Sequence, residues 1–381
     1  MDNMFSSEVE SIEISGIRKF FNKVSKYEDA LSLTLGQPDF PVPSKIKQSI
    51  IQAINDDKTR YTENAGIPEL RDEICKFLSC QNLVYSKDNV IITVGGSEAL
   101  YISFKALLNR GDKVLIPSIA YPAYNSIVNL MGACAIDYKL NEDFSIDIDS
   151  LEKLIKDENP KILVLSFPSN PTGAVINKID LERLHKIILE NDILVISDEI
   201  YSSICYEDYY SIASYKDIKD KIILISGFSK MFSMTGLRLG YLCASEKIIK
   251  NIIKVHQYNV SCAPSIVQYG VVTGLKYCMD DVDYMRDEFK KRRDLVYERL
   301  NAMGLKTNLP KGAFYIFPSI KKYKISSEKF CDKLLEQEKL AVVPGSAFGN
   351  GGEGYIRISY CCSEEVLTEA LNRLERFIKS C

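Results

Sequence analysis

The sequence is poor in histidine, which limits the kinds of active site it can build. Its 381 residues include only two histidines, His185 and His256. A three-histidine metal site is therefore excluded, no metal is expected, and any histidine-dependent triad would have to use one of these two residues. His185 lies in a helical pattern and His256 in a polar stretch, so we interpret both as ordinary surface or boundary histidines.

An excess of positive charge is also missing. The chain has 48 lysines and arginines against 51 aspartates and glutamates, and its pI is near 5.7. Such a balance supplies no positive field for a phosphate backbone, so we expect no nucleic-acid partner. No run approaches about 18 uninterrupted apolar residues, which predicts no membrane association. The N-terminal segment carries acids where a signal peptide needs basic residues, so no targeting signal is expected.

Paired cysteine motifs are absent, although cysteine itself is not rare. The 11 cysteines are odd in number and scattered, with one adjacent pair, Cys361 and Cys362, and no CxxC pair. This distribution indicates reduced thiols rather than a disulfide or zinc framework, and a cytoplasmic location. The length and the 46% hydrophobic content suffice for about two or three domains with a substantial core.

The middle of the chain alternates short apolar runs with amphipathic helical patterns, such as Glu98 to Leu108 and Leu181 to Glu190. This alternation predicts an α/β fold: a large domain over 46–275, with a mostly parallel sheet flanked by helices and right-handed crossovers. The runs that we interpret as buried strands are Val90 to Val94, Lys113 to Ile116, Ile162 to Phe167, Ile193 to Ser197 and Ile222 to Ser226.

A different pattern begins after about residue 275. A charged helical stretch over 285–300 precedes strand-like segments at 313–317 and 355–360, a helix near 329–337 and a final helix from Glu364. This order predicts a smaller α+β domain over 276–381. The proline-containing first 45 residues are expected to be extended in part and to pack beside it, so that 1–45 and 276–381 form one domain.

Residues placed for chemistry should follow the strands, because open parallel sheets form their active sites beyond the carboxyl ends of the strands. The turn Gly95-Gly96-Ser97 joins a strand to a helix and offers free N–H groups to a phosphate. Asp198 ends another strand, where a buried acid needs a cationic partner. Asn170 could donate a hydrogen bond to a phenolate oxygen, although its motif could also be a plain Asn-Pro turn.

Lys230 follows the next strand, with Arg238 shortly after it. A lone lysine is more often a solvated surface residue. Together with Asp198 and the glycine-serine turn, however, Lys230 is a candidate Schiff-base lysine beside a pyridinium partner and a phosphate site. These are the three features that pyridoxal phosphate requires.

The sequence resembles the class I/II aminotransferases, the fold type I pyridoxal-phosphate enzymes, over nearly its whole length. The resemblance rests on ordered motifs: GQPDF at 36–40, YTENAGIPELR at 61–71, GGSEAL at 95–100, YPAY at 121–124, SNPTG at 169–173, SDEIY at 197–201, SGFSKMFSMTGLRLGY at 226–241 and YIRISY at 355–360.

The resemblance implies pyridoxal 5'-phosphate as cofactor and a role for each matching residue. Lys230 would carry the cofactor, Asp198 would pair with its pyridine nitrogen, Asn170 and Tyr201 would bind its phenolic oxygen, and Tyr121 would stack on its ring. The phosphate would be held by Gly96, Ser97, Ser229 and Arg238, and by Tyr61 of a second subunit, which implies a homodimer. Arg357 and the backbone of Gly36 would bind the substrate α-carboxylate.

The family pattern is broken at one point, because Gly227 stands where many members have a phosphate-binding serine. Either Ser226 or Ser229 would then supply that hydroxyl. The opening of the chain is similar to a subgroup that includes N-acetyl-LL-diaminopimelate and aromatic aminotransferases. Ser97 stands where some dicarboxylate-specific relatives have a lysine, so we expect a longer or bulkier substrate side chain. Ile17 and Arg18 are candidate lid residues, although for Arg18 a solvated surface arginine is the favoured interpretation.

The expected reaction is transfer of an amino group from an L-amino acid to a 2-oxo acid by a ping-pong mechanism. A β-lyase or a cyclopropane-carboxylate-synthase-like enzyme would share the first steps and remains an alternative. A non-catalytic regulator would need an added DNA-binding domain, for which residues 1–45 are too short.

Overall fold

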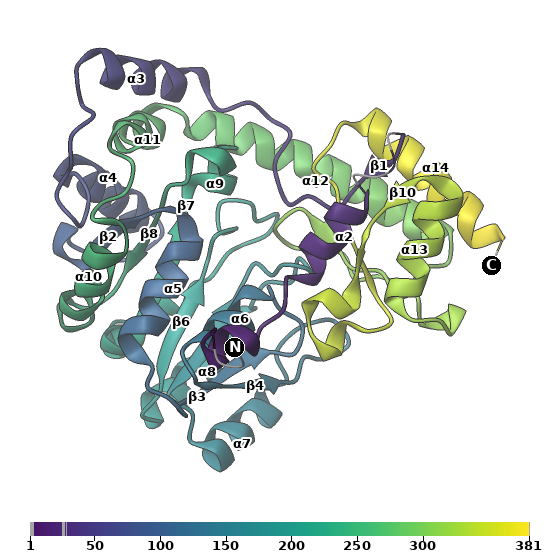
Figure 1. Cartoon of the computed structure of the whole chain (residues 1–381), viewed down its shortest axis with the longest axis horizontal. Helices are drawn as coiled ribbons and strands as arrows, with labels where there is room; N and C mark the ends of the chain where they lie inside the picture. Colours follow the sequence, from purple (N-terminus) through teal and green to yellow (C-terminus); the bar gives the residue numbers. More distant parts are fainter. Residues whose placement is uncertain (1–3, 25–26, 28, 381) are drawn as a thin grey trace.

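The computed structural model describes residues 4–24, 27 and 29–380. The protein has a mixed α/β fold with a large and a small part (Figure 1). The larger part contains a seven-stranded sheet with helices on both faces, and the smaller part contains short strands and the last helices. The predicted fold class is confirmed. The boundaries of the two domains remain predictions. Among the described residues, no helix is both long and apolar enough to cross a membrane.

The large sheet has the strand order β2-β8-β7-β6-β5-β3-β4. Neighbouring strands from β7 to β4 run parallel, whereas β8 is antiparallel to both of its neighbours, β7 and β2. The strands are β2 (Val90–Thr93), β3 (Lys113–Pro117), β4 (Cys134–Tyr138), β5 (Ile162–Ser166), β6 (Leu194–Asp198), β7 (Ile222–Gly227) and β8 (Gly240–Cys243).

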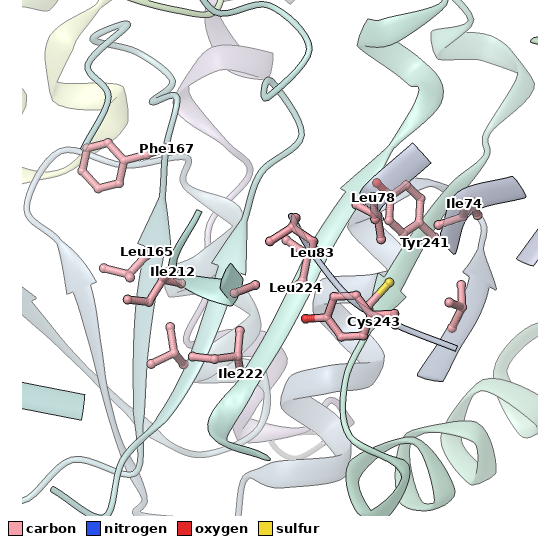
Figure 2. Close-up of a cluster of buried hydrophobic side chains, with 14 of the residues drawn as sticks. Ile74, Leu78, Leu83, Leu165, Phe167, Ile212, Ile222, Leu224, Tyr241 and Cys243 are labelled. Carbon is pink, nitrogen blue, oxygen red and sulfur yellow. The ribbon is translucent and has the colours of Figure 1, made fainter. Parts of the chain in front are cut away.

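Side chains alternate between the two faces of this sheet, and both faces are buried. In β3, Leu115 belongs to the core on one face, whereas Val114 and Ile116 belong to the core on the other. Figure 2 shows part of the first core, in which Leu165 of β5 and Leu224 of β7 lie on the same face. Burial on both faces explains why these strands are continuous apolar runs in the sequence.

Two groups of helices cover the sheet and contribute to the two cores. One face carries α3 (Ser44–Asn55), α4 (Pro68–Ser79), α7 (Ile148–Glu158), α8 (Lys178–Glu190) and α11 (Ser265–Tyr277). The other face carries α5 (Gly95–Leu107), α6 (Ala123–Leu130) and α10 (Glu246–Val260). The short helix α9 (Phe228–Met231) follows β7 directly.

The smaller part joins the two ends of the chain, because β1 pairs in parallel with β10. The helices α1 (Ser7–Glu10) and α2 (Gly16–Val24) precede β1, and α2 lies between the large and small parts in Figure 1. The remaining elements are β1 (Leu31–Ser32), α12 (Met279–Ala302), β9 (Tyr315–Ile316), α13 (Ser327–Glu338), β10 (Leu340–Ala341), β11 (Val343–Pro344), β12 (Ile356–Ser359) and α14 (Glu364–Lys379).

The five predicted strands are all present, with ends within one residue of those expected. Two further strands of the sheet, β4 and β8, were not predicted. The interpretation of His256 as a surface or boundary residue is wrong, because its side chain is fully buried. Its two ring nitrogens have partners inside the protein, which is what allows a polar ring to be buried there.

Candidate active site

A cavity of about 440 Å³ lies at the carboxyl ends of β5, β6 and β7, and residues from both parts of the protein line it. It brings together all but one of the site residues predicted from the sequence. Those that line it are Gly36, Gly96, Ser97, Tyr121, Asn170, Asp198, Tyr201, Ser229, Lys230, Arg238 and Arg357. The exception is Tyr61, whose side chain is exposed and lies outside the cavity lining.

Lys230 enters the cavity from α9, which immediately follows strand β7. Its Nζ donates a hydrogen bond to the carbonyl oxygen of Gly36, a residue of the N-terminal segment. Burial lowers the pKa of this amine to about 8, and the positive charges of Arg357 and Arg238 act in the same direction. Near neutral pH, Lys230 is therefore far easier to deprotonate than a surface lysine.

Asp198 is the last residue of β6 and is buried. Its Oδ2 accepts a hydrogen bond of 2.7 Å from the hydroxyl of Tyr124, and its Oδ1 accepts one of 3.2 Å from the backbone N–H of Ile200. Burial nevertheless raises the pKa of Asp198, because these two bonds offset only part of the cost of desolvating the charge. A cation beside the carboxylate would remove that cost.

The glycine turn before α5 lies against Arg238. Gly95 has a φ of +74°, and a Cβ atom there would lie 2.6 Å from Nη2 of Arg238. Only glycine allows the guanidinium this close to the first turn of the helix. Gly96 and Ser97 follow in that turn and line the cavity, so free backbone N–H groups, a hydroxyl and a guanidinium meet at one end of it.

The two serines considered for phosphate binding lie in different environments. Ser229 lines the cavity. Ser226 does not, and its hydroxyl donates a hydrogen bond of 3.2 Å to the carbonyl oxygen of Glu199. The geometry therefore favours Ser229 over Ser226 for contact with a ligand.

Arg357 of β12 is buried and contributes to the cavity from the small part of the protein. Its Nη1 donates a hydrogen bond of 2.9 Å to Oδ1 of Asn170, and its Nη2 donates one to the carbonyl oxygen of Thr34. Its Nε is buried and has no hydrogen-bond partner among the described residues. Burial lowers the pKa of this guanidinium, because the charged form is costly to desolvate. An anion bound beside Arg357 would offset that cost.

Two tyrosines predicted to contact the cofactor also line the cavity. The hydroxyl of Tyr201 lies 2.9 Å from that of Tyr315. The ring of Tyr121 packs edge to face against Tyr124, with ring centroids 5.8 Å apart. Burial raises the pKa of both Tyr121 and Tyr201, so both are neutral hydrogen-bond donors at pH 7.

Side chains of α2 close one side of the cavity. The two candidate lid residues, Ile17 and Arg18, line it together with Phe21. A second cavity of about 800 Å³ lies on the other side of this segment, and Ser15 and Tyr121 border both cavities. Among the described residues, no group of three or more histidine, cysteine or acidic side chains could hold a metal ion.

Comparison with known proteins decides the family. The sequence matches the family described as aminotransferase class I and II over residues 28–374. A Bacillus subtilis (strain 168) protein named probable N-acetyl-LL-diaminopimelate aminotransferase is 43% identical over 384 residues, which cover 99% of this chain and 96% of that protein. The chain belongs to the class I and II aminotransferases.

Solved structures of other aminotransferases have the same fold. An aromatic aminotransferase from Pyrococcus horikoshii OT3 superposes with a TM-score of 0.90 at 40% identity, covering 95% of this chain and 99% of that one. Aspartate aminotransferase from Thermus thermophilus with maleate superposes with a TM-score of 0.93 at 33% identity, covering 98% and 99%. The protein is thus a transaminase of the predicted fold type, and the lyase alternative is not favoured.

Several residues lining the site of this aminotransferase were not predicted from the sequence. Tyr124 binds Asp198, and its hydroxyl also lies 2.8 Å from that of Ser166. Thr34 and Tyr315 both contact Arg357. The second tyrosine of the YPAY motif was the available signal for Tyr124. Tyr315 comes from a two-residue strand of the small part, and nothing in its local sequence points to the cavity.

Proposed function

We propose that this aminotransferase uses pyridoxal 5'-phosphate and acts as a homodimer on an amino acid with a long or aromatic side chain. The observation that carries the cofactor assignment is that one cavity brings together Lys230, the carboxylate of Asp198 and the glycine turn beside Arg238. These groups match an aldehyde, a protonated pyridine nitrogen and a phosphate respectively.

The residues fit this cofactor in size and in charge. The turn at Gly95 is a cradle that a Cβ atom would obstruct, and Arg238 lies directly over it. We assign phosphate binding to the N-terminus of α5, with Gly96 and Ser97, and to Ser229 and Arg238. Asn170 and Tyr201 would hold the phenolic oxygen, and Tyr121 would stack on the ring.

When bound, the cofactor supplies an electron sink for the pair of electrons left at the substrate Cα. Asp198 would keep the pyridine nitrogen protonated, since a buried carboxylate favours a cationic partner. Lys230 would hold the cofactor covalently. As a free amine, with its pKa lowered to about 8, Lys230 could also take a proton from the substrate Cα and return it to another carbon.

Arg357 would bind the substrate α-carboxylate. Its buried Nε has no partner among the described residues, and its planar fork suits a carboxylate. Asn170 and the Thr34 carbonyl hold the two terminal nitrogens and so fix the plane of the fork. The backbone of Gly36 would complete the carboxylate site, next to Lys230.

The substrate side chain would extend toward α2, where Ile17, Arg18 and Phe21 line the cavity. We propose N-acetyl-LL-diaminopimelate or an aromatic amino acid, in keeping with the names of the two similar aminotransferases cited above. A panel of amino donors against 2-oxoglutarate, read by conversion of the cofactor, tests this. Aspartate as the best donor by kcat/KM, unchanged in Arg18→Ala, would contradict the proposed pocket.

The dimer is proposed because Tyr61 is 87% exposed. A tyrosine that binds the phosphate in a neighbouring subunit would be exposed in this way when one chain is viewed alone. A cytoplasmic location is proposed on the cysteines, since those that the structure describes carry free thiols.

Two variants test the cofactor assignment. Lys230→Ala should be folded and should lack the borohydride-reducible cofactor adduct of the natural protein, whereas Lys247→Ala, at an exposed lysine, should retain it. Asp198→Asn should still bind the cofactor and lose most of its turnover. An adduct that persists in Lys230→Ala would refute the role of that lysine. Release of ammonia and pyruvate in place of a new amino acid would indicate lyase chemistry.

A further inference from the structure

Tyr315 of β9 lies at the centre of the proposed active site, although neither the sequence motifs nor the family match gives it a role. Its side chain is 1% exposed and lines the same cavity as Lys230 and Arg357. It comes from the small part of the protein, whereas Lys230 comes from the large part. Its contacts therefore join groups that belong to different parts of the fold.

The hydroxyl of Tyr315 forms a hydrogen bond of 2.9 Å with the hydroxyl of Tyr201. Each neutral phenol has a single O–H donor. If Tyr315 donates to Tyr201, the proton of Tyr201 is left to donate into the cavity. If Tyr201 donates instead, it has no proton to offer a ligand.

Arg357 favours the first arrangement. The centre of its guanidinium lies 4.4 Å from the centroid of the Tyr315 ring. A cation over the ring withdraws electron density from the phenol and makes its O–H a better donor. Burial raises the pKa of Tyr315 to about 12 while the charge of Arg357 opposes that rise, so Tyr315 is neutral and able to donate at pH 7.

Gly36 limits where the Tyr315 hydroxyl can move. A Cβ atom on Gly36 would lie only 1.9 Å from the Tyr315 Oη, so the phenol reaches its position only because residue 36 is glycine. The Tyr315 ring is thus held between Arg357 and the Gly36 segment, with its hydroxyl directed at Tyr201.

We propose that Tyr315 is a positioning residue that donates a hydrogen bond to Tyr201, orienting the Tyr201 hydroxyl toward the phenolic oxygen of the cofactor, while its ring supports Arg357. This inference rests on the cofactor site proposed above. It predicts two separable roles: the hydroxyl acts on the cofactor through Tyr201, and the ring acts on the substrate carboxylate through Arg357.

The hydroxyl role is tested by a pH titration of the visible absorption of the lysine-bound cofactor. A donor to the phenolic oxygen stabilises its negative form and lowers the pKa of this absorption change. Tyr315→Phe should therefore raise that pKa by about half to one unit, the value of one ordinary hydrogen bond. In a Tyr201→Phe background, Tyr315→Phe should produce no further shift, because the hydroxyl that it orients is missing.

The ring role is tested by steady-state kinetics. Tyr315→Phe keeps the ring, so KM for the amino donor should stay within about twofold, whereas Tyr315→Leu should raise KM about tenfold through loss of the cation–π contact. This split between KM and the absorption pKa is not expected from a general loss of stability.

Tyr206→Phe is a matched control. Tyr206 also shares a hydrogen bond with a tyrosine hydroxyl, that of Tyr360 at 3.3 Å, and also lies under an arginine, with Arg293 4.8 Å from its ring centroid. It does not line the cavity. This variant should leave both the absorption pKa and KM unchanged.

The proposal is overturned if Tyr315→Phe leaves the absorption pKa unchanged, if the shift is additive with that of Tyr201→Phe, or if Tyr206→Phe shifts it equally. Failure of the cofactor assignment has a different signature, since the natural protein would then show no visible absorption that depends on Lys230.

Discussion

The Nδ1 atom of His256 lies 3.0 Å from Oε1 of Glu98, and its Nε2 atom lies 2.8 Å from the carbonyl oxygen of Asn64. Glu98 also accepts a hydrogen bond of 2.5 Å from the backbone N–H of Val94, just before the glycine turn. Burial disfavours the Glu98 carboxylate, but the bonds from His256, Val94 and Asn259 outweigh it and lower its pKa. The pair thus connects the proposed phosphate turn to the segment that carries Tyr61.

Removal of the His256 side chain should therefore lower the free energy of unfolding much more than removal of the His185 side chain. His256→Ala should lower the free energy of unfolding by about 2–4 kcal/mol, because it leaves a buried carboxylate short of a donor. His185→Ala is the comparison, since His185 pairs with the half-exposed Asp217 and should cost less than about 1 kcal/mol. Urea unfolding measures both. Equal effects would show that the buried pair contributes no more stability than the exposed pair of His185 and Asp217.

Gly36→Ala should damage activity more than stability. The added methyl group would lie 1.9 Å from the Tyr315 Oη, so either Tyr315 or the Gly36 segment must move. We expect kcat/KM to fall at least about tenfold, because a displacement of about 1 Å in an active site has effects of this size. Gly236→Ala is the control, since a Cβ atom there meets nothing within 4 Å, and it should stay within about twofold of the natural protein. Similar losses in both variants would argue against the steric explanation.

The lowered pKa of Lys230 predicts a pH-dependent stability of the cofactor-free protein. Its pKa is about 8 in the folded state and about 10.4 in an unfolded chain. Between these values only the unfolded chain holds the proton, so the free energy of unfolding should rise with pH. Relative to Lys230→Met, the natural protein should gain about 1–3 kcal/mol from pH 7.5 to 10.5. Parallel curves for the two proteins would place the pKa of Lys230 near its ordinary value.

The dimer proposal makes a prediction about mixed subunits. Tyr61→Phe and Lys230→Ala each damage the active site, but in different subunits if Tyr61 acts in trans. Mixed dimers of the two variants should regain one intact site and hence activity that neither variant has alone. Light scattering should show a dimer. A fully active monomer would contradict both the assembly and the role of Tyr61.

The large sheet and most of the site could be predicted because their signals are local. Each strand of the parallel core is buried on both faces and is therefore a continuous apolar run. Asp198 ends one such run, and Lys230 follows the end of another by three residues. Strand β8 was missed because it begins at the end of a motif that we interpreted for its lysine and arginine, and its antiparallel pairing with β2 and β7 depends on contacts distant in sequence.

The burial of His256 and the place of Tyr315 could not be predicted for a related reason. The polar stretch around His256 gives no indication that Glu98 and Asn64 lie beside it. Tyr315 is one aromatic residue among several in AFYIF, and its partners Tyr201 and Arg357 come from other elements. Such contacts are set by tertiary packing and leave no periodic signal in the chain.

The hydrogen bond from Arg357 to the carbonyl oxygen of Thr34 joins residues 323 positions apart in the sequence, and the parallel pairing of β1 with β10 adds a second link of this kind. The proposed cofactor end of the cavity is formed by residues 95–238, which leave the ribosome earlier. The proposed carboxylate end needs Arg357 of β12, close to the C-terminus. During synthesis, the N-terminal segment therefore cannot form its contacts with Arg357 and β10 until nearly the whole chain has been made. The substrate end of the cavity is the last to be completed.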